Sequence, residues 1–241
     1  YIFRTCYTDK FQGKLMADFA FYSTHCRRAA VLTNISESYS KILSRFFAAS
    51  FEANGGRIVY EGGYKGSATD FEKILVPMIH RKPDVIFVPG YTQDSGLIIK
   101  QARKLGVDAA FMGGDAWETT VAQYAGRALN GCYFSTFWHP NVPYRRNREF
   151  LARFNTSYGE RKISAYVPLA YDAVWLLADA IRRCQSVTSE KIRDALAATS
   201  GFQGATGSFS FDANGDPVNK GASILRFEAD DWIFHKAFEP E

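Results

Sequence analysis

The feature that most constrains this chain is a strand–helix–strand pattern in its middle. Asp84–Pro89 and Ala109–Met112 are short apolar runs rich in Val, Ile, Phe and Ala, and runs of this kind are typical of fully buried strands. Between them, Gln93–Leu105 places apolar residues on one face of a helix, and Gly106 ends that helix. Because a helical crossover joins strands that run in the same direction, the pattern predicts a parallel sheet.

The same alternation of strand and helix patterns extends over the first 137 residues. Further strands are expected at Tyr1–Cys6, Ala29–Leu32, Arg57–Tyr60 and Cys132–Phe137, and helices at Lys14–Tyr22, Glu37–Ala53, Thr69–His80 and Thr119–Gly126. Alternation at this pitch predicts an α/β fold, in which helices cover both faces of the sheet.

The pattern changes after the two prolines of residues 139–144. Three helices and then several strands are expected at Arg145–Tyr158, Ala165–Cys184, Ser189–Thr199, Gly204–Phe211, Ser223–Phe227 and Trp232–Ala237. No strand separates the three helices, so their apolar faces need another surface to pack on. We therefore predict one α/β unit with a helical excursion whose own sheet is absent from this sequence.

Several classes of chemistry have no signature in the chain. There is no GxGxxG between a strand and a helix, no Walker loop, no GxSxG and no HExxH. The four histidines are scattered, and the four cysteines have spacings that fit no metal framework. We expect no catalytic group, no metal and no cofactor. The cysteines are expected to be buried or half-buried thiols, with one disulfide left open for an oxidising compartment.

Charge and hydropathy exclude two kinds of partner. The formal net charge of +4 is mild for 241 residues, and no zinc finger, RNP motif or basic helix is present, so we expect no nucleic acid. No apolar run reaches the roughly 18 residues that a membrane helix needs, so we expect no direct membrane insertion.

Polar side chains follow three of the predicted strands. Tyr39 lies in the segment after the strand at residues 29–32, Tyr91 follows the strand at residues 84–89, and Asp115 follows the strand at residues 109–112. In open parallel sheets, ligands bind outside the carboxyl ends of the strands, so we expect these three side chains to lie close together. A carboxylate pairs with an ammonium group taken from water, and aromatic rings attract cations. The pattern predicts a site for a small cationic or zwitterionic ligand.

Each of these residues also has a simpler interpretation. Asp115 could cap the helix that follows it, and Tyr39 and Tyr91 could be ordinary half-buried tyrosines. Trp117 is expected to pack in the core rather than to contact a ligand. An α/β enzyme with Asp115 as general base would need an acid or a nucleophile on an adjacent strand end, and we find none.

The chain resembles the type I periplasmic solute-binding proteins of the branched-chain amino acid (Leu/Ile/Val-binding) ABC transporter family. The matching segments are FRTCYTDKFQG, DVIFVPGY, LIIKQARKLG, FMGGDAW, GCYFSTFWHP, LAYDAVWLLADAI and TGSFSFDANGDPV, which span nearly the whole chain in family order. The resemblance implies the type I fold, in which two α/β lobes joined by three crossing strands close over an amino acid. The crossings would be Tyr1–Cys6, Cys132–Phe137 and Gly204–Phe211.

On this template, residues 1–137 and 204–241 form lobe two, with the ligand-binding loops at its strand C-termini. Residues 138–203 form the C-terminal helical part of lobe one. The N-terminal part of lobe one, about 110 to 120 residues of a domain-sized piece, is missing from the sequence. The helices of residues 145–199 would then expose an apolar face, and we expect partial disorder there or covering by a second copy.

The resemblance also implies a function. The chain would belong to the extracytoplasmic solute-binding component of an ABC transporter, not to an enzyme, and would bind a branched-chain or similar amino acid. Tyr39, Tyr91 and Asp115 match the family's ligand-binding positions, and Tyr166 matches a position that approaches the ligand from the other lobe. The expected partners are this amino acid and the membrane permease subunits.

The sequence leaves alternatives open for the cellular location and for the function of the chain. The resemblance implies a periplasmic or extracytoplasmic place, although no signal peptide and no initial Met are present, which indicates a mature product, a processed piece or a shortened chain. The alternative function is that of a ligand-sensing receptor domain with the same fold.

Overall fold

The computed structural model describes residues 1–238, which form two compact units. Unit 1 consists of residues 1–8, 136–223 and the end of the described chain from Lys236, and unit 2 consists of residues 9–135 and 224–235. No helix in the described part of the chain is both long enough and apolar enough to cross a membrane.

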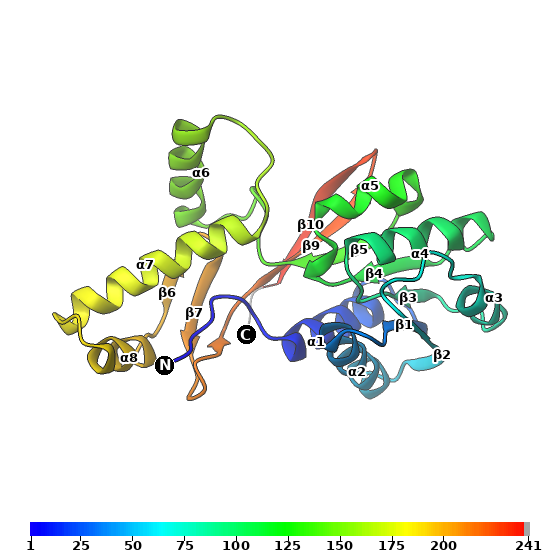
Figure 1. Ribbon diagram of the computed structural model, residues 1–241, viewed down its shortest axis with the longest axis horizontal. Helices are drawn as coiled ribbons and strands as arrows, with labels where there is room; N and C mark the ends of the chain where they lie inside the picture. Colours follow the sequence, from blue (N-terminus) through cyan, green and yellow to red (C-terminus); the bar gives the residue numbers. More distant parts are fainter. Residues whose placement is uncertain (239–241) are drawn as a thin grey trace. The chain divides into compact units, whose positions relative to one another are not determined.

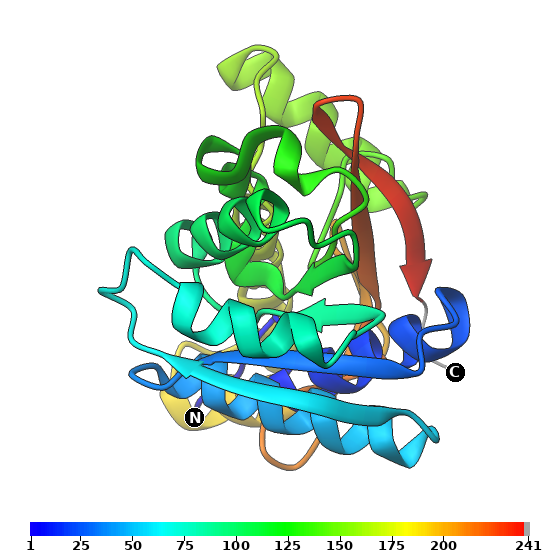
Figure 2. The ribbon, with the colours of Figure 1, turned by 90° about the vertical axis from the view of Figure 1, so that its right-hand side faces the viewer.

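Unit 2 contains most of a seven-stranded sheet of order β10-β9-β5-β4-β3-β1-β2. The strands are β1 (Arg28–Asn34), β2 (Arg57–Tyr64), β3 (Val85–Phe87), β4 (Ala110–Gly113), β5 (Tyr133–Thr136), β9 (Ala222–Glu228) and β10 (Asp231–Phe238). The pairs β1–β2, β1–β3, β3–β4 and β4–β5 are all parallel, and Figure 2 shows β1 and β2 side by side. The parallel sheet predicted from the alternating pattern is confirmed.

Helices cover both faces of this sheet (Figure 1). They are α1 (Asp9–Asp18), α2 (Ser38–Ala53), α3 (Glu72–His80), α4 (Thr92–Lys104) and α5 (Ala122–Ala125), with a π-helical turn at Phe19–Ser23 and 3₁₀ turns at Asp115–Trp117, Thr119–Val121 and Gly126–Leu129. Side chains alternate across a strand, so Ile86 packs in the core beneath α3 and α4, whereas Phe87 stacks on Phe47 of α2 with ring centroids 4.0 Å apart.

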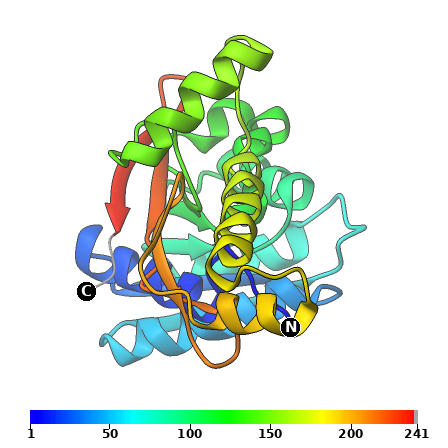
Figure 3. The same ribbon diagram turned by 90° about the vertical axis from the view of Figure 1, so that its left-hand side faces the viewer.

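Unit 1 contains the three consecutive helices and a small antiparallel sheet (Figure 3). The helices are α6 (Arg145–Tyr158), α7 (Tyr166–Cys184) and α8 (Ser189–Ala197), and the strands are β6 (Phe202–Gly204), β7 (Gly207–Phe211) and β8 (Pro217–Val218). The sheet order is β6-β7-β8, with antiparallel pairs. The bounds of α6 are those that its helical pattern predicts.

Several local predictions differ from the structure. The helix expected at Lys14–Tyr22 begins earlier, at Asp9, and its α-helical part ends at Asp18, where a π-helical turn follows. Tyr1–Cys6 is not a strand: the backbone N–H of Arg4 donates to the Gly215 carbonyl at 3.2 Å and the Arg4 side chain pairs with Asp216, but one backbone bond does not make a ladder. The helix expected from Thr69 begins at Glu72 instead, because the Asp70 carboxylate accepts the Glu72 N–H at 3.0 Å and so fixes a turn before it.

A buried polar cluster, here called the Asp172 clamp, joins α7 to the turn between β6 and β7. The Asp172 carboxylate accepts hydrogen bonds from the Ala205 N–H at 2.7 Å, the Thr206 N–H at 2.9 Å and the Thr206 hydroxyl at 2.6 Å. The Lys220 ammonium donates to the Thr206 carbonyl at 3.0 Å and to its hydroxyl. Burial lowers the pKa of Lys220 to about 8, against the opposing charge of Asp172. The clamp satisfies both buried charges within unit 1.

One face of α7 is apolar and exposed. Val167, Val174 and Leu177 lie on this face at helical spacing, and Val174 and Leu177 are 69% and 45% exposed. Large apolar side chains at this spacing are usually buried against a neighbouring element. The exposed stripe of α7 therefore agrees with the predicted apolar face of the helical excursion.

Candidate functional site

Three strand ends of unit 2 bring Tyr39, Tyr91 and Asp115 together. Tyr39 lies in the first turn of α2, Tyr91 directly precedes α4, and Asp115 follows β4. The Tyr39 hydroxyl donates a hydrogen bond to Asp115 Oδ1 at 3.1 Å, and the Tyr39 and Tyr91 ring centroids are 5.7 Å apart with a tilt of 39°. The parallel sheet thus places these residues side by side, as its topology predicts.

Asp115 does not cap a helix. It opens a three-residue 3₁₀ turn, and the cap position before that turn is held by Gly114. Gly114 leaves room for the phenol, since a Cβ atom at this position would lie 2.3 Å from the Tyr39 hydroxyl. The Asp115 carboxylate thus accepts the Tyr39 hydroxyl, and it does not stand at the cap position of the turn that it opens.

The loops that carry Tyr91 and Asp115 are tied to each other. The Thr92 hydroxyl lies 3.2 Å from the Ala116 carbonyl and 3.3 Å from the Trp117 carbonyl, which both accept its proton. Trp117 is fully buried, and its indole N–H donates to the Val88 carbonyl at 2.9 Å. Trp117 packs in the core, as predicted, and helps to hold the rim of the site.

Acidic side chains surround the exposed Tyr91 phenol. Its pKa is raised by partial burial and then, in decreasing order, by the negative charges of Glu37, Asp115, Asp94 and Asp9. An excess of negative charge at a half-exposed aromatic ring attracts a cationic group. In the described part of the chain, no three His, Cys, Asp or Glu side chains gather to hold a metal ion.

Sequence reasoning missed three of these acidic residues, Glu37, Asp94 and Asp9, and one amide. Glu37 stands at the N-cap of α2 and makes no capping bond, and Asp94 is buried in the first turn of α4. Gln12 of α1 is buried and donates to the Ser135 hydroxyl at 3.0 Å, near Gly114. Glu37 could have been found from the sequence, because it is a charged residue two positions before Tyr39. Asp94 and Gln12 come near the site through contacts between distant segments, and such contacts leave no periodic pattern in the sequence.

Tyr166 lies in unit 1, at the start of α7. Its side chain is half exposed, and its ring centroid is 5.6 Å from that of Phe137. The structure therefore places three of the four predicted site residues together in unit 2, while the contribution of Tyr166 stays a prediction.

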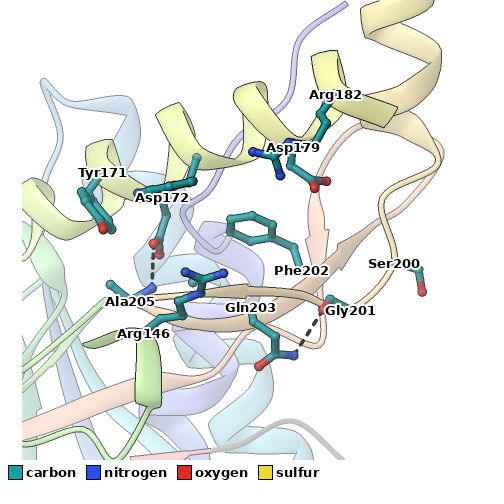
Figure 4. Close-up of a pocket in the computed structure, with 12 residues that line it drawn as sticks. Arg146, Tyr171, Asp172, Asp179, Arg182, Ser200, Gly201, Phe202, Gln203 and Ala205 are labelled. Atoms are coloured by element: carbon teal, nitrogen blue, oxygen red, sulfur yellow. Dashed lines mark hydrogen bonds between the residues drawn. The ribbon is translucent and has the colours of Figure 1, made fainter. Parts of the chain in front are cut away.

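Unit 1 has a pocket of its own between α7 and the segment that leads into β6. It encloses about 290 Å³ and is lined by the aromatic rings of Tyr171 and Trp175, the guanidinium groups of Arg146 and Arg182, and residues 200–205 (Figure 4). The Asp172 carboxylate in its lining already accepts a hydrogen bond from the Ala205 backbone N–H. None of the predicted site residues lines this pocket.

Comparison with known proteins defines the class to which this fold and this site belong. The profile of the family described as "Periplasmic binding protein" matches residues 1–231. The chain belongs to the periplasmic binding protein family, whose members bind solutes and are not enzymes. The type I α/β fold predicted from the resemblance is confirmed at this level.

Individual relatives are more distant. The chain is 25% identical to the "Leucine-, isoleucine-, valine-, threonine-, and alanine-binding protein" of Pseudomonas aeruginosa, over 95% of this chain and 61% of that protein. It is 26% identical to "Leu/Ile/Val-binding protein homolog 1" of Brucella suis, over 94% of this chain and 60% of that protein. The chain thus spans about three fifths of the length of these curated relatives.

Two solved structures match the whole chain. The leucine binding protein LivK of Thermotoga maritima superposes with a TM-score of 0.92 at 31% identity, and the match covers 100% of this chain and 68% of that one. The substrate-binding protein LivJ of Streptococcus pneumoniae, solved in complex with isoleucine, gives a TM-score of 0.88 at 30% identity with the same coverage.

Proposed function

We propose that this chain is part of the extracytoplasmic solute-binding component of an ABC transporter and that it grips an amino acid of the branched-chain type or a similar one. The observation that carries the proposal is the cluster of Tyr39, Tyr91 and Asp115 at the carboxyl ends of parallel strands. The relatives support it, since one is described as binding leucine, isoleucine, valine, threonine and alanine, and another was solved with isoleucine.

In this proposal, each site residue has a distinct role. Asp115 pairs with the ligand's ammonium group, because a charge removed from water needs a counter-charge. Tyr39 and Tyr91 supply a hydroxyl and aromatic walls, and Tyr166 approaches the ligand from the other lobe. Closure of two lobes over the ligand then produces the shape that membrane permease subunits recognise. No bond is made or broken.

We further propose that the complete protein has two lobes, with residues 1–137 and 204–241 in lobe two and residues 138–203 as the C-terminal helices of lobe one. The remaining part of lobe one would be a further segment of about 110 to 120 residues, a domain-sized piece. This division differs from the two compact units, because it places residues 1–8 and 204–223 in lobe two, whereas the compact units group them with the three helices. The exposed stripe of α7 supports it, since a sheet of lobe one would cover such a face.

The site assignment is tested by an Asp115→Ala variant of the complete binding protein. Titration calorimetry with isoleucine and leucine should show binding weaker by about 2–4 kcal/mol, the loss typical when a buried charge loses its partner. Asp108→Asn, on an exposed position, is the matched control and should bind as the parent does. Unchanged affinity in Asp115→Ala would show that the ammonium group is held elsewhere.

A further inference from the structure

Next to the candidate site, two buried polar side chains donate hydrogen bonds to one carboxylate oxygen of a third. The Tyr64 hydroxyl, at the end of β2, donates to Asp94 Oδ2 at 2.6 Å, and Asn34 Nδ2, at the end of β1, donates to the same oxygen at 3.3 Å. All three residues are at most 5% exposed. We call this cluster the Asp94 latch. It joins the ends of two strands to the first turn of α4, which directly follows Tyr91.

Asn34 connects the latch to the loop that leads to Tyr39. Its Oδ1 accepts the Ser36 N–H at 3.1 Å, while its Nδ2 donates to Asp94, so one amide holds both loops. The backbone N–H of Asn34 donates to the Ser40 hydroxyl at 2.9 Å, one residue beyond Tyr39. The positions of the two site tyrosines are therefore coupled through a single side chain.

The chain also passes very close to the latch just before Tyr91. A Cβ atom at Gly90 would lie 2.2 Å from the Tyr64 hydroxyl and 2.8 Å from Asp94 Oδ2. A neighbour this close leaves no space for the backbone at position 90 to shift toward the latch. The conformation of the residue next to Tyr91 is thus set by the hydroxyl and the carboxylate that it touches.

The latch has an energetic cost that a purely structural core would avoid. Asp94 has no ion-pair partner in the described part of the chain, and burial raises its pKa, although hydrogen bonds from Tyr64, the Ser95 backbone and Asn34 partly offset this effect. Apolar side chains of similar volume often replace buried ionic groups without loss of stability. A buried carboxylate without a counter-ion beside a binding loop therefore indicates a role in placing that loop.

We propose that Asp94 is a positioning residue for the binding site: through Asn34 and Tyr64 it fixes the Tyr91 loop relative to the Tyr39 loop. The effect of Asp94 on ligand affinity rests on the proposed function, whereas its effect on the distance between the Tyr39 and Tyr91 rings does not. The two effects are measured separately, so that failure of one is distinguishable from failure of the other.

The first arm uses the 241-residue chain without ligand. Nuclear Overhauser effects between the Tyr39 and Tyr91 rings, 5.7 Å apart at their centroids, report the geometry directly. We expect these signals to be lost in Asp94→Ala and retained in Asp94→Asn, since one amide oxygen can accept from both Tyr64 and Asn34. Slow amide exchange in β1 and β3 checks that each variant is folded.

Ser95→Ala is the matched control. Ser95 is adjacent in sequence and fully buried, and its hydroxyl has no hydrogen-bond partner among the described residues. Its removal should leave the ring signals unchanged. Ring signals that persist in a folded Asp94→Ala variant would overturn the proposal, as would their loss in Ser95→Ala. If Asp94→Ala does not fold, Tyr64→Phe removes one latch hydroxyl alone and should weaken the same signals; unchanged signals there would also overturn the proposal.

The second arm measures affinity for isoleucine in the complete binding protein. Asp94→Ala should bind about tenfold more weakly, the effect of one lost buried hydrogen-bonded group, and Asp94→Asn should recover most of the loss. Loss of the ring contact with unchanged isoleucine affinity would refute the ligand role of the tyrosines while leaving the latch in place. Unchanged ring contact with reduced affinity would refute the latch.

Discussion

The two units of this molecule bury their helices in different ways. In unit 2, Ile98 and Ile99 of α4 are fully buried against the sheet, and Phe87 and Phe47 fill its other face. In unit 1, Val174 of α7 stays largely exposed. Unit 2 therefore builds a core from its own residues, whereas unit 1 has more apolar helix surface than its small sheet covers.

The two units also differ in how they pair a buried carboxylate. Asp172 in unit 1 accepts three close hydrogen bonds within a clamp that also contains the ammonium group of Lys220. Among residues 1–238, Asp94 in unit 2 has no cationic partner, and it accepts hydrogen bonds from Tyr64, Asn34 and the Ser95 backbone. The buried carboxylate of unit 1 thus shares its cluster with a cation, whereas the one in unit 2 is held by neutral donors beside the candidate site.

The largest effect is expected from Phe87→Ala in unit 2. This change leaves a cavity beneath α2 and should lower the free energy of unfolding by about 3–5 kcal/mol. The control, Val174→Ala on the exposed stripe of α7, should change it by less than about 0.5 kcal/mol. Urea unfolding followed by fluorescence measures both. Equal losses in the two variants would mean that the α7 stripe is covered in solution and would remove the contrast between the units.

An intermediate effect is expected from Asp172→Asn, which leaves one acceptor for the three donors of the clamp. The unsatisfied N–H and hydroxyl groups should cost about 1–3 kcal/mol in unfolding free energy, measured in the same way. Asp179→Asn is the matched control on the same helix, because Asp179 is half-exposed and pairs with Arg183 at the surface. Its loss should stay below about 1 kcal/mol. If Asp172→Asn lost no more unfolding free energy than this control, the Asp172 clamp would not stabilise unit 1.

A third effect concerns the pH dependence of stability. Because burial lowers the pKa of Lys220 to about 8, the unfolded chain holds a proton that the folded chain lacks between about pH 8 and the ordinary value of 10.5. The contribution of Lys220 to stability therefore rises with pH across this window, by at most about 1.4 kcal/mol per unit. Lys220→Met should remove this rise when the two unfolding curves are compared from pH 7.5 to 10. Parallel curves would show that Lys220 keeps an ordinary pKa.

Much of the fold follows from patterns within short windows. The apolar runs at residues 84–89 and 109–112 and the helix between them predict the centre of the parallel sheet, and α6 begins and ends where its pattern indicates. The strand expected at Tyr1–Cys6 fails because a strand depends on a partner edge, and composition alone does not supply one. Similarly, Asp70 moves the start of α3 through a local side-chain bond that competes with the helix start expected at Thr69.

The site divides in the same way. Tyr39, Tyr91 and Asp115 could be placed together because parallel strands present their carboxyl ends on one edge. Asn34 and Asp94, sixty positions apart, meet through side chains, and no periodic signal predicts such a pair. The lobe boundaries and the part played by Tyr166 stay predictions.

Gly114 has a consequence for how a pocket of this kind can diverge. Its backbone, with φ of −99° and ψ of −173°, is one that any amino acid adopts, but a Cβ atom there would lie 2.3 Å from the Tyr39 hydroxyl, 2.9 Å from Leu43 Cδ2 and 3.0 Å from Gln12 Nε2. A one-carbon replacement there must displace these neighbouring side chains, among them the phenol that contacts Asp115. A single codon change at this position would thus alter the surroundings of the Tyr39–Asp115 contact without changing either residue.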